Sequence, residues 1–462
     1  MTVLSRPWNR LSTTGKIVLP LIVLISVGTV ALLAAWLSGL LPWLIGAILD
    51  TLGANIGIVR FVLAATAILL MTVPTAFIII FLELKVIAFV NLRIGPNRTG
   101  PWGTLASVMH GFKVLAKEDF TPTGADVPVF TLAPVVAYLA SVLTLLVVPF
   151  APGLFGFDMD LGLLYFFAVG GLGVIGLMMA GWSSFNKYSL LGGLRAAAGI
   201  ISYEIPLTLS VVGVIMLTGT LSLNKIVELQ SGSVLNWFAV QQPLAFIIFF
   251  IAATAEGGRT PFDLTEADSE IVAGFATEYS GMRFGFFFFA EYVNVFILSA
   301  LTSVIFLGGW NAPFDINPVL QFFHVTVSPS LDFGGLGMGL LWVIVFGPPV
   351  ATLVLALPLW LLNTSWSFLK SLVIAFLLLN VLLMVAVLVW AAMSFPVVIG
   401  LFWFLGKTFT IAVLFVLMRG TLPRVRIDQL MGFAWKWLIP ASLANIFVTA
   451  GAILVIHQLR GG

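Results

Sequence analysis

Long apolar runs separated by short polar segments dominate this sequence. Each run is about long enough to cross a hydrocarbon core roughly 30 Å thick as a helix. The runs lack the apolar–polar alternation of barrel strands, so helices are the expected spanning elements. We therefore predict an all-α polytopic membrane protein with about eleven transmembrane helices. The predicted spans are residues 17–41, 60–82, 129–149, 161–182, 197–219, 241–256, 284–308, 338–361, 371–393, 397–418 and 437–456.

Composition agrees with a membrane protein and removes several kinds of chemistry. Only 9% of the 462 residues are charged, whereas soluble domains average roughly 25%. The chain has no cysteine, which excludes disulfides and thiolate-held iron–sulfur clusters within it. Its three histidines, at positions 110, 324 and 457, are far apart in the sequence. We therefore expect no metal site built from this chain alone.

The basic residues predict the orientation in the membrane. If the N-terminus is cytoplasmic, 17 of the 21 lysines and arginines fall on the cytoplasmic side. Only Arg60, Lys225 and Arg460 fall outside, and Lys407 lies within a span. Cytoplasmic loops are enriched in basic residues, so we predict a cytoplasmic N-terminus and an external C-terminus.

Two acidic residues fall inside predicted spans. Glu204 lies about two turns into an apolar helix that we expect to begin near Arg195, and Glu291 lies about two turns into the span 284–308. A carboxylate inside a membrane is costly unless it is paired, protonated or hydrated. The pattern favours proton transfer, although a structural ion pair with a neighbouring span explains such acids too.

The segment 255–292 carries the densest acidic pattern. Asp263, Glu266 and Glu270 lie at i, i+3 and i+7, on one helical face, while Asp268 lies off that face and Glu278 follows. Like charges this close can share protons. Aromatic and aliphatic residues interrupt the acids, which is unusual for a solvated loop. Together with the acids inside the spans, this segment indicates a proton relay.

Two further features concern basic residues. Lys407 lies near the middle of the span 397–418 and is a candidate partner for a buried carboxylate; extension of its side chain to the membrane surface is the alternative. Residues 102–117 place apolar side chains at helical spacing with lysines elsewhere. The spacing of the apolar residues in 102–117 predicts a short amphipathic helix at the membrane surface.

Several motifs together resemble the family of the H subunit of NADH-quinone oxidoreductase. They include GPNR (95–98), GWSSFNKYSLLGGLRAAA (181–198), RTPFDL (259–264), TEYSGMRF (277–284) and RGTLPRVRIDQLM (419–431). The sequence differs from the usual family pattern at some positions: Leu84 replaces an arginine, Gly199 a glutamine and Asp268 a glutamate.

The resemblance implies a membrane subunit of respiratory complex I with eight family-like spans, a quinone chamber and a line of acids. It divides the chain into an N-terminal extension with one extra span (1–58), a family-like core (59–336), an inserted helix pair (337–396) and the last two core helices (397–462). The implied chamber residues are Glu83, Arg98, Arg259, Phe262, Asp263, Glu266 and Arg283. The expected proton path consists of Glu204, Glu256, Asp268, Glu270, Glu278, Glu291 and Lys407.

The resulting hypothesis is a quinone-binding, energy-coupling subunit of a proton-translocating NADH:quinone oxidoreductase in the bacterial plasma membrane. Quinone is then the substrate, nothing is covalently bound, and iron–sulfur clusters reside only in partner subunits. The expected partners are peripheral-arm iron–sulfur subunits, antiporter-like membrane subunits, lipid and quinone, with no nucleic acid. Three alternatives stay open at this point: the homologous membrane subunit of an energy-converting hydrogenase, a stand-alone proton or cation transporter, and a purely structural anchor.

Overall fold

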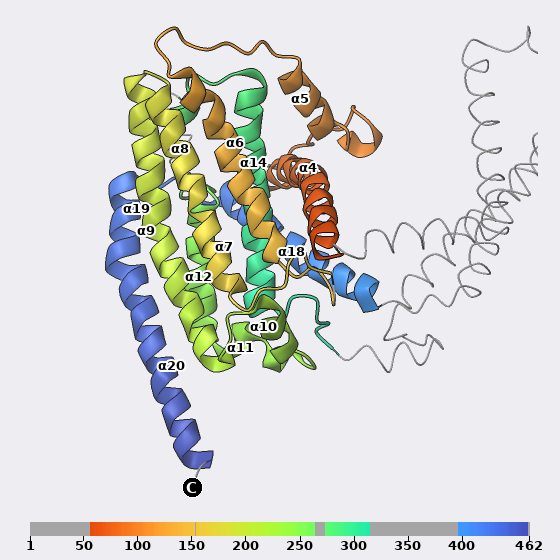
Figure 1. The fold of residues 1–462 in the computed structure, drawn as a ribbon, viewed down its shortest axis with the longest axis vertical. Helices are drawn as coiled ribbons and strands as arrows, with labels where there is room; N and C mark the ends of the chain where they lie inside the picture. The colour runs from red at the N-terminus through yellow and green to blue at the C-terminus, as the bar shows by residue number, and fades with distance from the viewer. Residues whose placement is uncertain (1–55, 153, 264–272, 315–395, 461–462) are drawn as a thin grey trace, which may run out of the picture. The chain divides into compact units, whose positions relative to one another are not determined.

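The computed structural model describes residues 56–152, 154–263, 273–314 and 396–460, and within these ranges it contains helices and no strand (Figure 1). Short 3-10 helices and one π-helical turn lie at Pro101–Gly103 (η1), Leu145–Val147 (η2), Val234–Asn236 (η3), Gly274–Ala276 (η4) and Ala434–Leu438 (η5). The α-helices are α4 (Ile56–Val90), α5 (Ala106–Leu115), α6 (Val127–Thr144), α7 (Gly162–Gly170), α8 (Leu172–Ser183), α9 (Lys187–Thr218), α10 (Leu223–Leu229), α11 (Phe238–Gln241), α12 (Pro243–Glu256), α14 (Gly281–Phe306), α18 (Pro396–Thr421), α19 (Ile427–Phe433) and α20 (Ile439–Arg460).

The helices confirm the prediction of an all-α polytopic membrane protein. Among the described residues, seven helical segments are long and apolar enough to cross a membrane: Thr72–Val90, Val127–Val147, Gly162–Ser183, Lys187–Thr218, Gly281–Phe306, Ile399–Thr421 and Ile427–Leu459. The shorter apolar helix Pro243–Glu256 matches the short predicted span 241–256. The predicted spans 17–41, 338–361 and 371–393 lie outside the described residues, as do most of the proposed divisions 1–58 and 337–396. The total of eleven spans therefore stays a prediction.

Three helix boundaries differ from those expected. Helix α9 begins at Lys187, because the side chain of Asn186 accepts a hydrogen bond from the amide of Tyr188 and caps the helix. Glu204 is therefore about five turns into α9, rather than two turns. Helix α4 continues beyond residue 82 to Val90, so Glu83 is helical. The predicted span 161–182 is two helices, α7 and α8, that meet at Gly171; glycine is a poor helix former because it loses the most backbone entropy.

The chain divides into two compact units, Met1–Leu63 and Ala64–Gly462. In the second unit, α9 packs against α8, α12 and α20, while α14 packs against α6 and α18. Every residue of α14 from Val295 to Phe306 is buried. A helix that is apolar on all sides belongs in a protein core, and α14 fills that role here.

Small residues bring the helices close together. A Cβ atom added to Gly176 of α8 would lie 2.8 Å from the backbone nitrogen of Ala137 in α6. One added to Gly181 of α8 would lie 3.1 Å from Cα of Gly193 in α9. Such contacts between backbones are typical of membrane helices, which associate through close packing of small residues.

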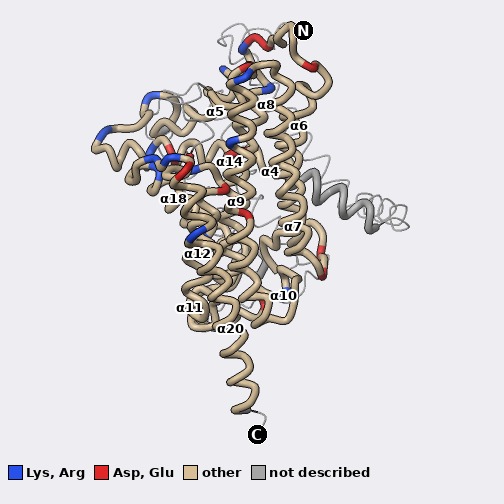
Figure 2. Tube along the Cα trace, turned by 90° about the vertical axis from the view of Figure 1, so that its left-hand side faces the viewer, with Lys and Arg blue, Asp and Glu red and all other residues tan. Residues whose placement is uncertain are grey.

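The charged residues are unevenly distributed. Figure 2 shows lysines and arginines gathered around α5, α18 and the tip of α8, with few along the opposite half of the helices. This distribution agrees with the prediction that most lysines and arginines lie on one side of the membrane. The sidedness itself stays a prediction.

Single introduced cysteines test the orientation, because the natural chain has none. Thr99 and Ser233 are both exposed and lie in connections on either side of the spanning helices. We expect a cysteine at Thr99 to react with an impermeant maleimide only from the cytoplasmic side, and one at Ser233 only from outside. Reaction of both from one side would contradict the predicted topology.

Candidate functional site

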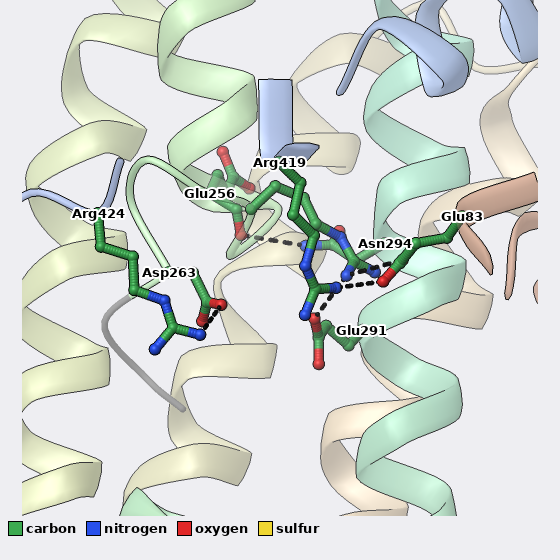
Figure 3. Close-up of polar contacts among 8 residues, drawn as sticks. Glu83, Glu256, Asp263, Glu291, Asn294, Arg419 and Arg424 are labelled. Carbon is green, nitrogen blue, oxygen red and sulfur yellow. Dashed lines mark hydrogen bonds and ion pairs between the residues drawn. The ribbon is translucent and has the colours of Figure 1, made fainter. Parts of the chain in front are cut away.

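A buried arginine lies at the centre of the charged residues inside the helix bundle. The side chain of Arg259 is 1% exposed, and its Nη1 atom lies 3.3 Å from Glu83 Oε2 and 3.3 Å from Glu291 Oε1. Arg419 Nη1 donates to the other oxygen of Glu83. Figure 3 shows Glu83, Glu291 and Arg419 converging. We call these four residues the Arg259 network; they come from α4, the segment after α12, α14 and α18.

The two carboxylates of the Arg259 network offset the burial of the Arg259 guanidinium. Burial by itself lowers the pKa of Arg259, but the carboxylates of Glu291 and Glu83 raise it, so that the net pKa lies above its ordinary value. The guanidinium also lies 4.4 Å from the centroid of the Tyr292 ring, where a cation–π interaction stabilises it. With two carboxylates and two guanidinium groups, the network is electrically balanced.

The Arg259 network is not fully satisfied by hydrogen bonds. Two nitrogens of Arg259, Nε and Nη2, have no hydrogen-bond partner among the described residues. Glu83 Oε2 meets Arg259 as an ion pair without hydrogen-bond geometry. Buried polar atoms usually find partners, and exceptions often mark functional positions. The network therefore has unused donors for a further ligand, water or rearrangement.

Local chain chemistry explains how Arg259 comes to lie inside the bundle. Helix α12 ends at Glu256, and Gly258 adopts φ +61°, a left-handed conformation that glycine accepts at little cost. The chain folds back so that the amide of Arg259 donates to the carbonyl of Thr254. The carbonyl of Pro261 then accepts from the amide of Val425, which fastens this turn to the connection between α18 and α19.

A second ion pair lies beside the network. Arg424 Nη2 lies 3.2 Å from Asp263 Oδ2; the carboxylate is buried, whereas the arginine is about half exposed. The neighbouring Phe262 packs against Tyr203 with a centroid distance of 5.4 Å and is stacked on Phe433 at 6.5 Å. Asp263 and Phe262 are thus held in place immediately before residues 264–272, which the structure does not describe.

An open cavity adjoins these residues. It lies between α6, α7, α8, α9 and α14, and Glu256, Phe262, Glu291 and Asn294 contribute to its wall. The side-chain amide of Asn294 donates to the carbonyl oxygen of Glu256 at 3.4 Å (Figure 3). One carboxylate oxygen of Glu256 is buried without a hydrogen-bond partner among the described residues.

Glycines leave part of the cavity wall empty. No heavy atom lies within 4 Å of a Cβ atom added to Gly170, Gly173 or Gly199, all of which line the cavity. Glu204 is half-buried nearby, with a carboxylate oxygen 3.6 Å from a Cβ atom added to Gly171. Glu204 and Glu256 are close enough to interact electrostatically.

The structure brings only some of the predicted site residues together. Glu83, Arg259 and Glu291 join in one network, and Phe262 and Glu256 reach the same cavity as Glu291. Arg98 is exposed after α4. Glu266, Asp268 and Glu270 lie outside the described residues.

Two other predicted site residues, Glu278 and Arg283, contact residues that are distant in the sequence. Glu278 accepts a hydrogen bond of 2.6 Å from the side chain of Asn186 at the start of α9. Arg283 forms an ion pair with Asp119 at 3.2 Å and lies over the ring of Phe130.

The prediction that Lys407 pairs with a buried carboxylate was wrong. Its Nζ atom donates to the backbone carbonyls of Leu307, Gly309 and Asn311, and none of the ion pairs among the described residues includes it. A backbone acceptor leaves no trace in the amino-acid pattern, so a carboxylate was the only partner that the sequence could suggest.

Sequence reasoning also missed Arg419 and Arg424. Both lie in the RGTLPRVRIDQLM motif, but in a chain with basic cytoplasmic ends they read as orientation signals. The signal that could have found them is charge balance: the buried acids Glu83 and Asp263 need nearby cations.

Comparison with known proteins assigns the chain to a family. The family model described as NADH dehydrogenase matches residues 62–450. The H subunit of NADH-quinone oxidoreductase from Dehalococcoides mccartyi strain CBDB1 is 40% identical over 388 residues, which cover 84% of this chain and 85% of that protein. The corresponding proteins of Brevibacillus brevis (39% over 399 residues; 86% and 94% covered) and Anoxybacillus flavithermus (43% over 373 residues; 80% and 87% covered) are similarly related. With its helical bundle and its buried acidic and basic residues, the chain belongs to the NADH dehydrogenase family, as a relative of the H subunit of NADH-quinone oxidoreductase.

Proposed function

We propose that this chain binds quinone in the cavity beside the Arg259 network and couples quinone reduction to proton translocation. One observation carries the proposal: Glu291 belongs to both the cavity wall and the buried network. A change of charge in the cavity therefore acts directly on a buried ion pair. The names of the relatives weigh against a stand-alone transporter.

The cavity suits an apolar ring that carries polar oxygens. Aromatic side chains, including Phe262, supply apolar contact, while Glu256, Glu291 and Arg195 place charges in the wall. Ligand sites usually combine an apolar lining with a few polar groups that fix orientation. Because the chain has no cysteine, the electrons would come from an iron–sulfur cluster in a peripheral partner subunit.

Coupling would follow from competition for Arg259. Reduction of a quinone places negative charge in the cavity before protons arrive, and that charge attracts nearby guanidinium groups. When Arg259 is drawn toward the cavity, Glu291 loses part of its compensation and takes up a proton more readily. The proton that Glu291 takes up in this step is the one that the subunit would pass on.

The proposed path runs from Glu291 past Asn294 to Glu256 and then to Glu204. Asn294 lies almost one turn after Glu291 on α14 and bonds the end of α12. We place water along Gly170, Gly173 and Gly199, where nothing lies within 4 Å of an added Cβ atom, because water can bridge carboxylates that do not touch. From Glu204 the proton would pass to antiporter-like membrane subunits.

Neutralising Glu291 tests the coupling. We expect Glu291→Gln to lower quinone reductase activity by about 100-fold or more, because the amide keeps the shape but carries no proton. Oxidation of the electron donor by an artificial acceptor should continue at the wild-type rate. Asp428→Asn, which removes an exposed carboxylate 3.9 Å from Arg426, should leave both rates unchanged. Equal loss of both rates in Glu291→Gln would mean that the residue only maintains assembly.

Removal of Arg259 tests the energetic role of the network. Arg259→Met leaves the buried Glu83 and the partly buried Glu291 short of a cation, and breaking a buried pair costs about 3–5 kcal/mol. Lys225→Met also removes one partner of an ion pair, but both Lys225 and its partner Asp160 are exposed, so the free energy of unfolding should stay nearly unchanged. Thermal unfolding of the purified assemblies measures both. Equal stability of the two variants would contradict the central role of Arg259.

Filling the cavity tests where the quinone binds. Gly199 and Gly451 both lie in helices with open space around an added Cβ atom, but only Gly199 lines the cavity. We expect Gly199→Leu to raise KM for quinone about tenfold with a smaller change in kcat, as lost binding space predicts. Gly451→Leu should change neither constant. An unchanged KM in Gly199→Leu would argue that the quinone binds elsewhere.

A further inference from the structure

The mid-helix cation Lys407 lies in a cradle of backbone carbonyls, away from the cavity. Its Nζ atom is 2.6 Å from the carbonyl oxygen of Leu307, 3.0 Å from that of Gly309 and 2.5 Å from that of Asn311. These three oxygens follow the C-terminal end of α14, whereas Lys407 projects from α18. We call them the carbonyl cradle.

Two glycines shape the carbonyl cradle. Gly308 and Gly309 have φ values of +73° and +49°, which other residues rarely adopt. A Cβ atom on Gly308 would lie 2.8 Å from Trp237 Nε1, and one on Gly309 would lie 2.8 Å from a methyl group of Val227. The backbone can therefore turn its carbonyls toward α18 only because neither residue has a side chain.

Polar side chains hold this turn in place. Gln230 accepts a hydrogen bond of 3.0 Å from the amide of Gly308, and its own amide donates to the carbonyl of Val304. The side chain of Asn311 donates to the carbonyl of Val227 at 2.6 Å. The oxygens are thus positioned by contacts that do not involve Lys407, so the carbonyl cradle has a framework of its own.

An aromatic ring adds to the carbonyl cradle. Nζ of Lys407 lies 4.4 Å from the centroid of the Trp237 ring, within the range of a cation–π interaction. Carbonyl oxygens and an aromatic face are groups that bind monovalent cations. The C-terminal end of α14 also carries the partial negative charge of its helix dipole. Each of these features favours a positive charge at this point.

The geometry discriminates between the two forms of the amine. An ammonium group has three N–H donors, one for each carbonyl. A neutral amine has only two donors, and its lone pair would face the third oxygen. The carbonyl cradle is therefore complete only when Lys407 is charged, whereas a proton carrier must lose its charge in each cycle.

We propose that the carbonyl cradle is a monovalent-cation site occupied by the ammonium of Lys407. In that role Lys407 is a positioning residue that fixes the end of α14 against α18, and it does not belong to the proton path. Glu291 lies 16 residues before Leu307 on α14, about 24 Å along the helix. At that level α14 is tied through Arg259 to Glu83, whose other oxygen binds Arg419 of α18. The register of α14 relative to α18 is then fixed at two levels.

The first test replaces Lys407 by arginine in the assembled complex. Arginine keeps a charge and several donors but does not release a proton in proteins. A fixed cation predicts that Lys407→Arg retains activity within about threefold and keeps the wild-type pH profile of quinone reduction. A loss of about 100-fold, the size expected when a proton-transfer group is removed, together with a changed pH profile, would overturn the proposal.

The second test empties the carbonyl cradle with Lys407→Ala and adds cations in solution. The amides of residues 307–311 should exchange hydrogen at least about tenfold faster than in wild type, because buried carbonyls lose their partner. Potassium or ammonium chloride should restore slow exchange with a saturable dose dependence. Tetramethylammonium chloride at the same ionic strength should not, because its methyl groups have no N–H donor and keep the charge away from the oxygens.

Potassium is the decisive cation because it carries no proton. Restoration by both potassium and ammonium supports a fixed-cation site, while restoration of activity by ammonium alone would indicate proton transfer and overturn the proposal. Unchanged exchange in Lys407→Ala would also overturn it. Lys225→Ala serves as a control, since Lys225 is exposed and paired with Asp160; its exchange at 307–311 should match wild type. The exchange measurement reports on the carbonyl cradle whether or not the protein binds quinone.

Discussion

A guanidinium group excluded from water is the constraint around which this helix bundle is organised. Arg259 is 1% exposed, and an uncompensated charge at that depth would cost several kcal/mol. Its compensation comes from helices distant in sequence, Glu83 of α4 and Glu291 of α14, with Arg419 of α18 completing the balance. The relative positions of three helices thus depend on one cation.

The same residues that fix the structure are those to which we assign the proposed coupling. An ion pair that is fully hydrogen-bonded would resist change, but Arg259 retains two nitrogens without a hydrogen-bond partner among the described residues. The network is balanced in charge and incomplete in hydrogen bonds. In the proposed function, a negative charge in the neighbouring cavity attracts Arg259, and a small shift of that side chain alters the environment of Glu291.

For the described residues, the sequence was sufficient to predict the spans, because the length and composition of an apolar run determine whether it can cross a membrane. It was less reliable where polar residues begin or extend a helix: the cap at Asn186 placed Glu204 deeper than the apolar pattern suggested. The motifs identified the charged residues near the cavity. They did not reveal that Glu83 would bind Arg419, 336 positions away, because pairings over such distances arise only when helices pack. The carbonyl partners of Lys407 could not be predicted for a different reason: every residue has a backbone oxygen, so the sequence does not mark which ones act as acceptors.

Two cations contact α14 and its C-terminal end, Arg259 at Glu291 and Lys407 at the carbonyl cradle, and they are bound in different ways. Arg259 is bound by carboxylates, whose charge changes when a proton arrives, so its interactions can be modified by the chemistry in the cavity. Lys407 is bound by carbonyls, which carry no proton to exchange and whose dipoles are fixed by the Gly308–Gly309 turn. One part of α14 is therefore responsive and the other constant. A helix that transmits a local change of charge needs such a fixed point, because without one the whole helix could shift to relieve the strain and no neighbouring group would respond.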